Sequence, residues 1–331
     1  MRVIKIDDIS KEALKNINEI ELQNKIYYFD DINFKYISDE KLYLKIKEVI
    51  GNDEEIIKIQ KNIITIPKGT ILFRVRKLDK KYYKKYFKDR CNLDAKNGKM
   101  EVNIPECIEF DEIKTEKDLW NPPSEKINTY GRINEPKESL LYLAIQEKTA
   151  LIECNVNEKD ISLYSRFLVE EDIKINFIGE LKEIEGDSIK ENQRKLNLID
   201  LFLKHQFSRE VGEGKEYLYR ISGMIAKKFF YTDEQDGWGY GSIADKEGYN
   251  LCLEPKKVEN KLKFIDSRIG VRLDDKNQCT YIFNLGVLLS SDDKKLCFYP
   301  LTAEEVKYRF QNIKHKNYIF MFDVLKRISE F

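Results

Sequence analysis

The chain has 331 residues, of which 42% are hydrophobic and 12% aromatic, so it holds enough apolar side chains for a sizeable core in one or two domains. Its 58 basic and 58 acidic residues balance, and no net charge draws it towards nucleic acid or an anionic membrane. No apolar run approaches the ~20 residues of a membrane span, and the N-terminus lacks the apolar core of a signal peptide. We therefore expect a cytoplasmic protein with no direct nucleic-acid or membrane partner.

The N-terminal segment, residues 1–60, is helical in pattern. SKEALKNINEIEL and DEKLYLKIKEVIG both place apolar residues at three- and four-residue spacing, which is typical of amphipathic helices. A turn at 67–70, PKGT, then precedes ILFRVRK, whose alternating character predicts a strand. Neither helix pattern carries a catalytic signature, so residues 1–60 are predicted to be a helical extension.

The segment LDKKYYKKYFKDR follows, and it has two interpretations. Its aromatic residues recur at four-residue spacing between lysines: Tyr82, Tyr83, Tyr86 and Phe87. Such a basic, aromatic surface suits nucleic acid or phosphate. The same pattern also fits one stripe of an amphipathic helix with solvated lysines, and we favour the helix.

Strand-like runs dominate residues 139–275, with two helix-like stretches among them. The strand-like runs are SLLYLAI, ISLYSRFLV, IKINFIG, WGYGSIA, YNLCLEP and KLKFIDS. The helix-like stretches are KENQRKLNLIDLFLKHQF and EYLYRISGMIAKKFF. Strands and helices do not alternate regularly, which predicts an α+β fold and argues against a doubly wound parallel sheet. Residues 276–331 resume with QCTYIFNLGVLLS, KLCFYPL and a helix-like end, and we expect this extension to pack on the core formed by residues 61–275.

Metal and disulfide chemistry are not expected. The two histidines, His205 and His315, stand in no metal-binding pattern. The six cysteines contain no C-x-x-C pair and are predicted to be free thiols in a reducing compartment: Cys91, Cys107, Cys154, Cys252, Cys279 and Cys297. Any acid-base or electrostatic work therefore falls to carboxylates.

Two glycine-rich motifs do not predict nucleotide-binding loops. GYGSIA at 239–244 satisfies the G-x-G-x-x-A fingerprint, but that fingerprint has its mechanism only between a strand and the start of a helix. Here the sequence leads into another strand. GEGKEY at 212–217 lacks the Ser or Thr and the upstream glycine of a phosphate loop.

The stretch YGRINEPKESLLYLAIQEKTALIEC, residues 130–154, sets three polar side chains among apolar residues. The planar fork of Arg132 matches phosphate oxygens. The ring of Tyr142 offers a flat face to an aromatic heterocycle. The carboxylate of Glu153 suits ribose hydroxyls and a positive charge that develops at an anomeric carbon. Pyrophosphate, ribose and a cationic aromatic base together describe NAD.

The same residues carry a resemblance to the RES-domain family, a bacterial family named for its arginine, glutamate and serine. LFRVR places Arg74 on the arginine of the family's first strand, and YGRINEP resembles its Gly-Gly-Arg-Trp-Asn turn. Tyr142 lies ten residues after Arg132 and Glu153 eleven residues after Tyr142, as in the family. GYGSIADKEGYNLCLEP resembles the late serine segment and supplies Ser242. The resemblance covers roughly residues 70–260, although Tyr130 and Ile133 stand where toxins of this family have glycine and tryptophan.

This resemblance implies a fold similar to ADP-ribosyltransferase toxins and an enzyme that cleaves the nicotinamide–ribose bond of NAD. NAD would be the substrate, and no separate cofactor is implied. Arg132, Tyr142 and Glu153 would form the catalytic set. Four further residues would bind NAD: Arg74, Tyr130, Ser242 and Asn250. An antitoxin or immunity protein is an expected partner, while the oligomeric state is not predicted.

Other interpretations stay open. Arg132 and Glu153 also suit a structural ion pair, Tyr142 suits a core position, and Ser242 suits a turn. Beside an NAD glycohydrolase or phosphorylase that acts as a toxin or defence effector, two other functions fit. One is a protein ADP-ribosyltransferase, and the other is a catalytically silent NAD-binding module.

Overall fold

The computed structural model describes residues 2–51, 53–77, 83–95, 98–110, 113, 115–156, 160–185, 190–242, 244–245, 247–272, 279–289 and 294–300. These residues form two compact units, and each unit combines segments that are distant in sequence. Unit 1 takes in described residues of 1–70, 122–143 and 169–262, and unit 2 those of 71–121, 144–168 and 263–331.

The N-terminal part of unit 1 is helical, as the sequence predicts. Its helices are α1 (Asp8–Lys15), α2 (Glu19–Tyr27), the 3₁₀ turn η1 (Tyr28–Asp31), α3 (Asp39–Ile50) and α4 (Glu54–Gln60). Side-chain caps set where they begin. Asp7, Asn18 and Ser38 each accept a hydrogen bond from a backbone N–H of the first turn, which satisfies a donor that has no partner within the helix.

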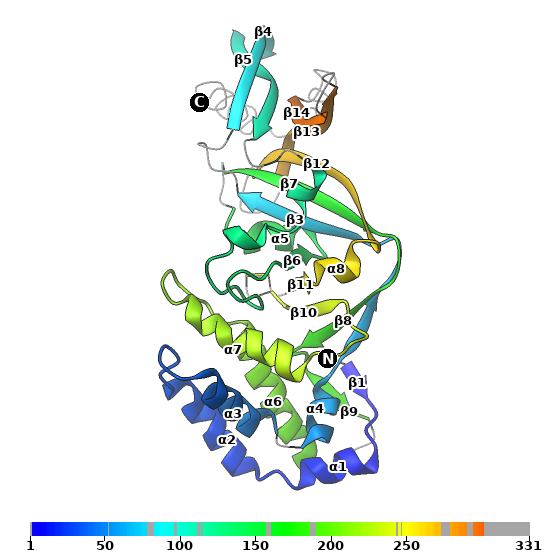
Figure 1. The fold of residues 1–331 in the computed structure, drawn as a ribbon. Coiled ribbons are helices and arrows are strands. Elements are labelled where there is room, and N and C mark those ends of the chain that lie inside the picture. Colours follow the sequence, from blue (N-terminus) through cyan, green and yellow to red (C-terminus); the bar gives the residue numbers. More distant parts are fainter. Residues whose placement is uncertain are drawn as a thin grey trace. The chain divides into compact units, whose positions relative to one another are not determined.

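Later segments add more helices to unit 1. They are η4 (Ser124–Lys126), α6 (Lys190–Phe207), η5 (Glu216–Leu218), α7 (Tyr219–Met224), the π-helical η6 (Ile225–Phe229) and α8 (Pro255–Val258). In Figure 1 the blue helices α1–α3 lie beside the green helices α6 and α7. Both helix-like stretches of the sequence are confirmed, and α6 spans all of KENQRKLNLIDLFLKHQF.

The strands of unit 1 form a mixed sheet and a small parallel pair. The sheet follows the order β2 (Ile63–Ile66), β8 (Ile173–Ile178), β10 (Gly237–Gly241), β11 (Tyr249–Leu253) and β6 (Leu141–Ala144). β8 and β10 are parallel, and α6 and α7 lie in the connection between them. β1 (Arg2–Ile4) pairs in parallel with β9 (Lys182–Ile184).

One apolar core holds the helices and the sheet of unit 1 together. Fully buried side chains come from the N-terminal helices, from α6 and from β10, among them Leu14, Leu42, Ile199 and Trp238. The buried ammonium of Lys195 donates to the carbonyl oxygens of Leu14 (3.1 Å) and Lys15 (3.1 Å), at the end of α1. A cation that satisfies the last carbonyls of a helix stabilises that end. The N-terminal extension is therefore integrated into unit 1.

Unit 2 is built from strands with few helices. Its strands follow the order β3 (Ile71–Lys77), β7 (Ile161–Val169), β12 (Leu262–Arg272), β13 (Cys279–Leu289), β14 (Lys294–Pro300), β5 (Gly98–Phe110) and β4 (Tyr83–Ala95). Its helices are η3 (Glu116–Leu119) and α5 (Glu147–Glu153). Ala150 and Leu151 of α5 pack against Val75 and Tyr164 of the sheet.

The predicted helix over LDKKYYKKYFKDR is wrong. From Tyr83 onward this segment is the strand β4, which pairs with β5 in an antiparallel hairpin. A spacing of four residues is a multiple of the two-residue period of a strand and also close to the turn of a helix. The spacing of the aromatic residues therefore does not distinguish the two structures, and pairing with β5 decides between them.

The observed fold is α+β, in agreement with the sequence prediction. The first three residues of GYGSIA, 239–241, belong to β10, and the next element among the described residues is the strand β11. Within the described residues, every helix is too short or too polar to cross a bilayer. The helix-like end after residue 300 lies outside the described residues, and the boundaries at 60 and 275 stay predictions.

Candidate functional site

A tight turn from Gly131 to Asn134 presents Arg132. The backbone N–H of Gly131 donates to the carbonyl oxygen of Asn134 at 3.0 Å. A Cβ atom at Gly131 would lie 2.1 Å from Asn134 Oδ1, so a side chain at this position forces the turn to open. Ile133 is fully buried and anchors the turn in the core of unit 1. The sequence GRIN therefore favours this turn. Gly131 allows the close approach of Asn134, and the buried Ile133 side chain holds the turn in the core.

The hydroxyl of Tyr142, on β6, holds this turn. It accepts hydrogen bonds from the backbone N–H groups of Ile133 (3.1 Å) and Asn134 (3.3 Å). It donates to Asn134 Oδ1 at 3.0 Å. Burial raises the pKa of Tyr142 well above its ordinary value, and the neighbouring Cys252 and Tyr240 act in the same direction. Tyr142 therefore stays protonated at neutral pH and supports the backbone that carries Arg132.

The guanidinium of Arg132 contacts two groups among the described residues. Its Nη1 donates to the carbonyl oxygen of Arg209 at 2.8 Å, and its Cζ lies 4.7 Å from the centroid of the Tyr219 ring. Nε and Nη2 have no hydrogen-bond partner in the described part of the chain, and Arg132 forms no ion pair there. A guanidinium carries five N–H donors, so most of these donors have no partner among the described residues.

Helix α7 packs against the turn that carries Arg132. Ser222 Oγ donates to the carbonyl oxygen of Arg132 at 2.5 Å. A Cβ atom at Gly223 would lie 3.0 Å from the carbonyl oxygen of Ile133, so the helix packs closely on the turn. Tyr219, the first residue of α7, supplies the ring beneath the guanidinium. The sequence predicts a helix for this stretch, but nothing in its pattern indicates the contact with Arg132.

The remaining predicted residues of unit 1 are Tyr130, Ser242 and Asn250. Tyr130 is half-buried and directly precedes Gly131. Asn250 is buried on β11, where it pairs with Tyr240 of β10. Ser242 follows β10, and its Oγ accepts a hydrogen bond from the Asp245 backbone N–H at 3.0 Å. This bond is typical of a turn-forming serine, so the turn interpretation of Ser242 has a structural basis.

The other two predicted residues, Arg74 and Glu153, belong to unit 2. Phe73 and Val75 contact the cluster formed with α5, and successive side chains of a strand point to opposite faces. Arg74 therefore leaves β3 on the face opposite α5, beside Ser165, its neighbour on β7. Its Nη1 is buried and has no hydrogen-bond partner in the described residues. A buried donor without a partner is costly, and an anionic ligand would satisfy it.

Glu153 is the last residue of α5 and is half-exposed. A carboxylate at the C-terminus of a helix meets the negative end of the helix dipole. The dipole of α5 therefore does not stabilise the negative charge of Glu153. Next to it, burial and the charge of Glu153 raise the pKa of the Cys154 thiol to about 11, and the thiol donates to the Val75 carbonyl oxygen at 2.9 Å. Cys154 is thus a packing residue and not a nucleophile at neutral pH.

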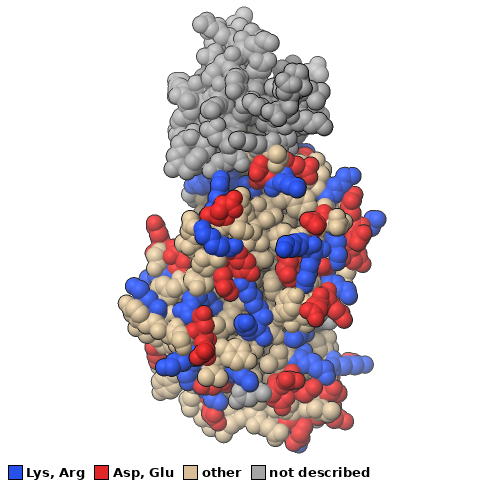
Figure 2. Space-filling model, in the orientation of Figure 1, with Lys and Arg blue, Asp and Glu red and all other residues tan. Residues whose placement is uncertain are grey.

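No group of three or more His, Cys, Asp or Glu side chains that suits a metal ion occurs among the described residues. His205 lies 3.0 Å from Asp30, from Nε2 to Oδ2, and His315 lies outside the described residues. Figure 2 shows basic and acidic side chains intermixed over the described surface of the face drawn. That face offers no single-sign area of the kind that binds a nucleic-acid backbone.

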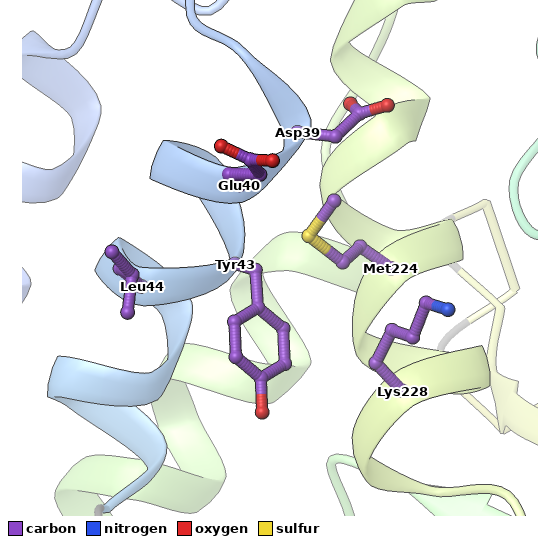
Figure 3. Close-up of a pocket in the computed structure, with 6 residues that line it drawn as sticks. All are labelled: Asp39, Glu40, Tyr43, Leu44, Met224 and Lys228. Carbon is purple, nitrogen blue, oxygen red and sulfur yellow. The ribbon is translucent and has the colours of Figure 1, made fainter.

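A hollow of about 400 Å³ lies elsewhere in unit 1, between α3 and the α7–η6 helix (Figure 3). Six residues line it: Asp39, Glu40, Tyr43, Leu44, Met224 and Lys228. None of them is a residue that the sequence predicted for the NAD site. The surface that lines it is almost wholly apolar, which does not suit a pyrophosphate.

No family model, no curated protein and no solved structure matches this chain.

Proposed function

We propose that this protein consumes NAD by cleaving the bond between nicotinamide and ribose. The observation that carries the proposal is the Arg132 guanidinium, which contacts Arg209 and Tyr219 and whose Nε and Nη2 have no hydrogen-bond partner among the described residues. A rigid, open guanidinium fork binds two oxygens of a pyrophosphate at once. The RES-like spacing of Arg132, Tyr142 and Glu153 supports the same proposal.

In the proposed reaction Arg132 binds the pyrophosphate and orients the dinucleotide. The bond between ribose C1′ and the pyridinium nitrogen breaks, and its electron pair leaves with neutral nicotinamide. The ribose becomes oxocarbenium-like, and the carboxylate of Glu153 stabilises its positive charge. Water or inorganic phosphate then bonds to C1′ and releases a proton, giving ADP-ribose or its phosphate.

The proposed roles of the other residues follow from their contacts. The unpartnered Nη1 of Arg74 supports a role in binding a phosphate oxygen. Tyr142 keeps its hydroxyl on the Arg132 turn, so it acts on NAD through its ring or through the position of Arg132. Ser242, Tyr130 and Asn250 complete the proposed NAD-binding set. We place the activity in the cytoplasm, in a toxin or defence effector that an antitoxin or immunity protein restrains.

Product analysis with NAD labelled in the adenine ring tests this proposal. We expect nicotinamide and free labelled ADP-ribose, or its phosphate when phosphate is supplied. Label that stays on protein would indicate a protein ADP-ribosyltransferase instead. NAD binding without any released nicotinamide would refute an enzymatic function and indicate a silent binding module.

A matched pair of arginine variants separates recognition by Arg132 from general charge effects. Arg132→Lys keeps the charge but loses the fork, so the Kd for NAD should rise about tenfold or more while the melting temperature is nearly unchanged. Arg194→Lys is the control, because Arg194 is an exposed arginine paired with Glu19. Equal NAD affinity in the two variants would remove the proposed role of Arg132.

A further inference from the structure

Among the described residues, two groups contact the Arg132 guanidinium, and each lies at or next to an arginine whose side chain binds the N-terminal segment. These groups are the carbonyl oxygen of Arg209 and the ring of Tyr219. Arg209 itself, and Arg220 directly after Tyr219, extend their side chains to residues between 28 and 39. All of these residues belong to unit 1. Residues 28–39 lie outside the part of the sequence that resembles the RES family.

The first connection runs through Arg209, whose side chain is only 17% exposed. Its Nη2 forms an ion pair with Asp30 Oδ1 and also donates to Gln206 Oε1 at 2.8 Å. Its Cζ lies 5.7 Å from the centroid of the Phe34 ring. The second carboxylate oxygen of Asp30 contacts His205 Nε2 at 3.0 Å. Asp30 therefore binds His205, at the end of α6, and Arg209. The carbonyl oxygen of Arg209 is the one that accepts the hydrogen bond from Arg132.

The second connection runs through Arg220, whose side chain is 15% exposed. It donates to the carbonyl oxygens of Phe34 (3.1 Å) and Ile37 (3.0 Å) and forms an ion pair with Asp39. These bonds fix the first turn of α7, where Tyr219 lies under the guanidinium. Two independent arginine contacts thus hold the two neighbours of Arg132 against one N-terminal segment.

We propose that residues 28–39 form a brace that holds Arg132 in the geometry required to bind the pyrophosphate of NAD, an inference that rests on the proposed function. Asp30 and Asp39 are positioning residues, since they act through Arg209 and Arg220 and not on the substrate. A recognition group that is held in place before binding loses less conformational entropy when the ligand arrives. The N-terminal extension thereby serves substrate recognition as well as the core.

Asp30→Asn tests the brace because it removes the charge and keeps the shape. We expect the KM for NAD to rise about three- to tenfold and kcat to change less, since Arg132 acts mainly in binding. The control is Glu48→Gln, which removes an exposed ion pair with Lys45 on α3. It should leave KM unchanged. In an Arg132→Lys background, Asp30→Asn should have almost no further effect on KM, because coupled residues are not additive.

A second readout needs no NAD. Phenylglyoxal modifies accessible guanidinium groups, and peptide mass spectrometry measures the rate at each arginine. Asp30→Asn should speed modification of Arg132 severalfold and leave the exposed Arg194 unchanged. If Asp30→Asn fails to fold, Arg209→Lys weakens the same contact and should give the same result.

The two readouts distinguish the brace from the proposed function. Faster modification of Arg132 supports the brace even if the wild type does not turn over NAD, in which case the proposed function alone fails. An unchanged modification rate at Arg132 overturns the brace whether or not NAD is consumed. An equal rise in KM in the wild-type and Arg132→Lys backgrounds also overturns it, because Asp30 then acts independently of Arg132.

Discussion

Replacing Tyr142 by phenylalanine removes one oxygen atom from the support of the Arg132 turn. The backbone N–H groups of Ile133 and Asn134 donate to that oxygen, and neither has a backbone acceptor among the described residues. Asn134 Oδ1 loses a donor as well. The variant thus leaves several polar groups of a half-buried turn without their partner.

The expected cost follows from these contacts. A typical hydrogen bond contributes about 1 kcal/mol, and a buried donor left without a partner costs about 1–3 kcal/mol. The two bonds to N–H groups are long, 3.1 and 3.3 Å, so the lower part of that range applies to each. We therefore predict that Tyr142→Phe lowers the free energy of unfolding by about 2–4 kcal/mol. The KM for NAD should rise as well, because the turn carries Arg132.

Urea denaturation measures this change, with Tyr36→Phe as the control. Tyr36 is 77% exposed, and surface substitutions of this kind usually change stability by less than about 0.5 kcal/mol. Burial raises the pKa of Tyr142, so the stability that its hydroxyl contributes is fully present below the unfolded pKa of about 10 and is lost as pH rises through the folded pKa. A Tyr142→Phe variant as stable as Tyr36→Phe at pH 7 would refute this account of the turn.

Two further predictions concern Ser242 and Asp30. Ser242→Ala should slow NAD turnover by several-fold to tenfold and not abolish it, since a single neutral hydrogen bond is worth ~1 kcal/mol; steady-state rates check this, and full activity would leave Ser242 a turn residue only. Burial raises the pKa of Asp30, but the hydrogen bonds and charges of Arg209 and His205 outweigh it and lower the pKa overall. The stabilisation that the Asp30 carboxylate contributes is therefore present above its pKa in the unfolded chain, about 3.9, and is lost as pH falls through its pKa in the folded protein. The stability difference between wild type and Asp30→Asn should persist from pH 7 to 5 and shrink below pH 4, and a difference independent of pH would exclude the ion pair as its source.

The helices of unit 1 were predictable because local signals agree with the tertiary structure. In KENQRKLNLIDLFLKHQF the apolar spacing predicts one amphipathic helix, and α6 buries that stripe from Leu196 to Phe207. In LDKKYYKKYFKDR the spacing of four fits helix and strand alike. This segment is the strand β4 because it pairs with β5. The spacing of its own residues does not reveal that pairing.

The candidate site also has a part that the sequence predicts and a part that it does not. Arg132 and Tyr142 are only ten residues apart, and the sequence assigns both to the same candidate site. In the structure the Tyr142 hydroxyl contacts the turn that carries Arg132. The contacts of Arg132 with Arg209 and Tyr219 arise from packing between segments far apart in the chain. No periodicity or motif marks Arg209, whose contribution is a backbone oxygen. Such a contribution has no side-chain signature in a sequence.

Nicotinamide release by wild type and by Glu153→Gln tests the central claim most directly. Glutamine keeps the shape of Glu153 and most of its hydrogen bonds but removes the negative charge that would stabilise the oxocarbenium-like ribose. Preorganised groups of this kind contribute ~3–4 kcal/mol to the transition state, whereas the ground state demands much less charge. We predict that Glu153→Gln folds, binds NAD with nearly wild-type Kd and releases nicotinamide at least a hundredfold more slowly, about the factor for one such group. Glu48→Gln, the control, should match the wild type. A folded Glu153→Gln that releases nicotinamide at the wild-type rate would contradict the proposed mechanism.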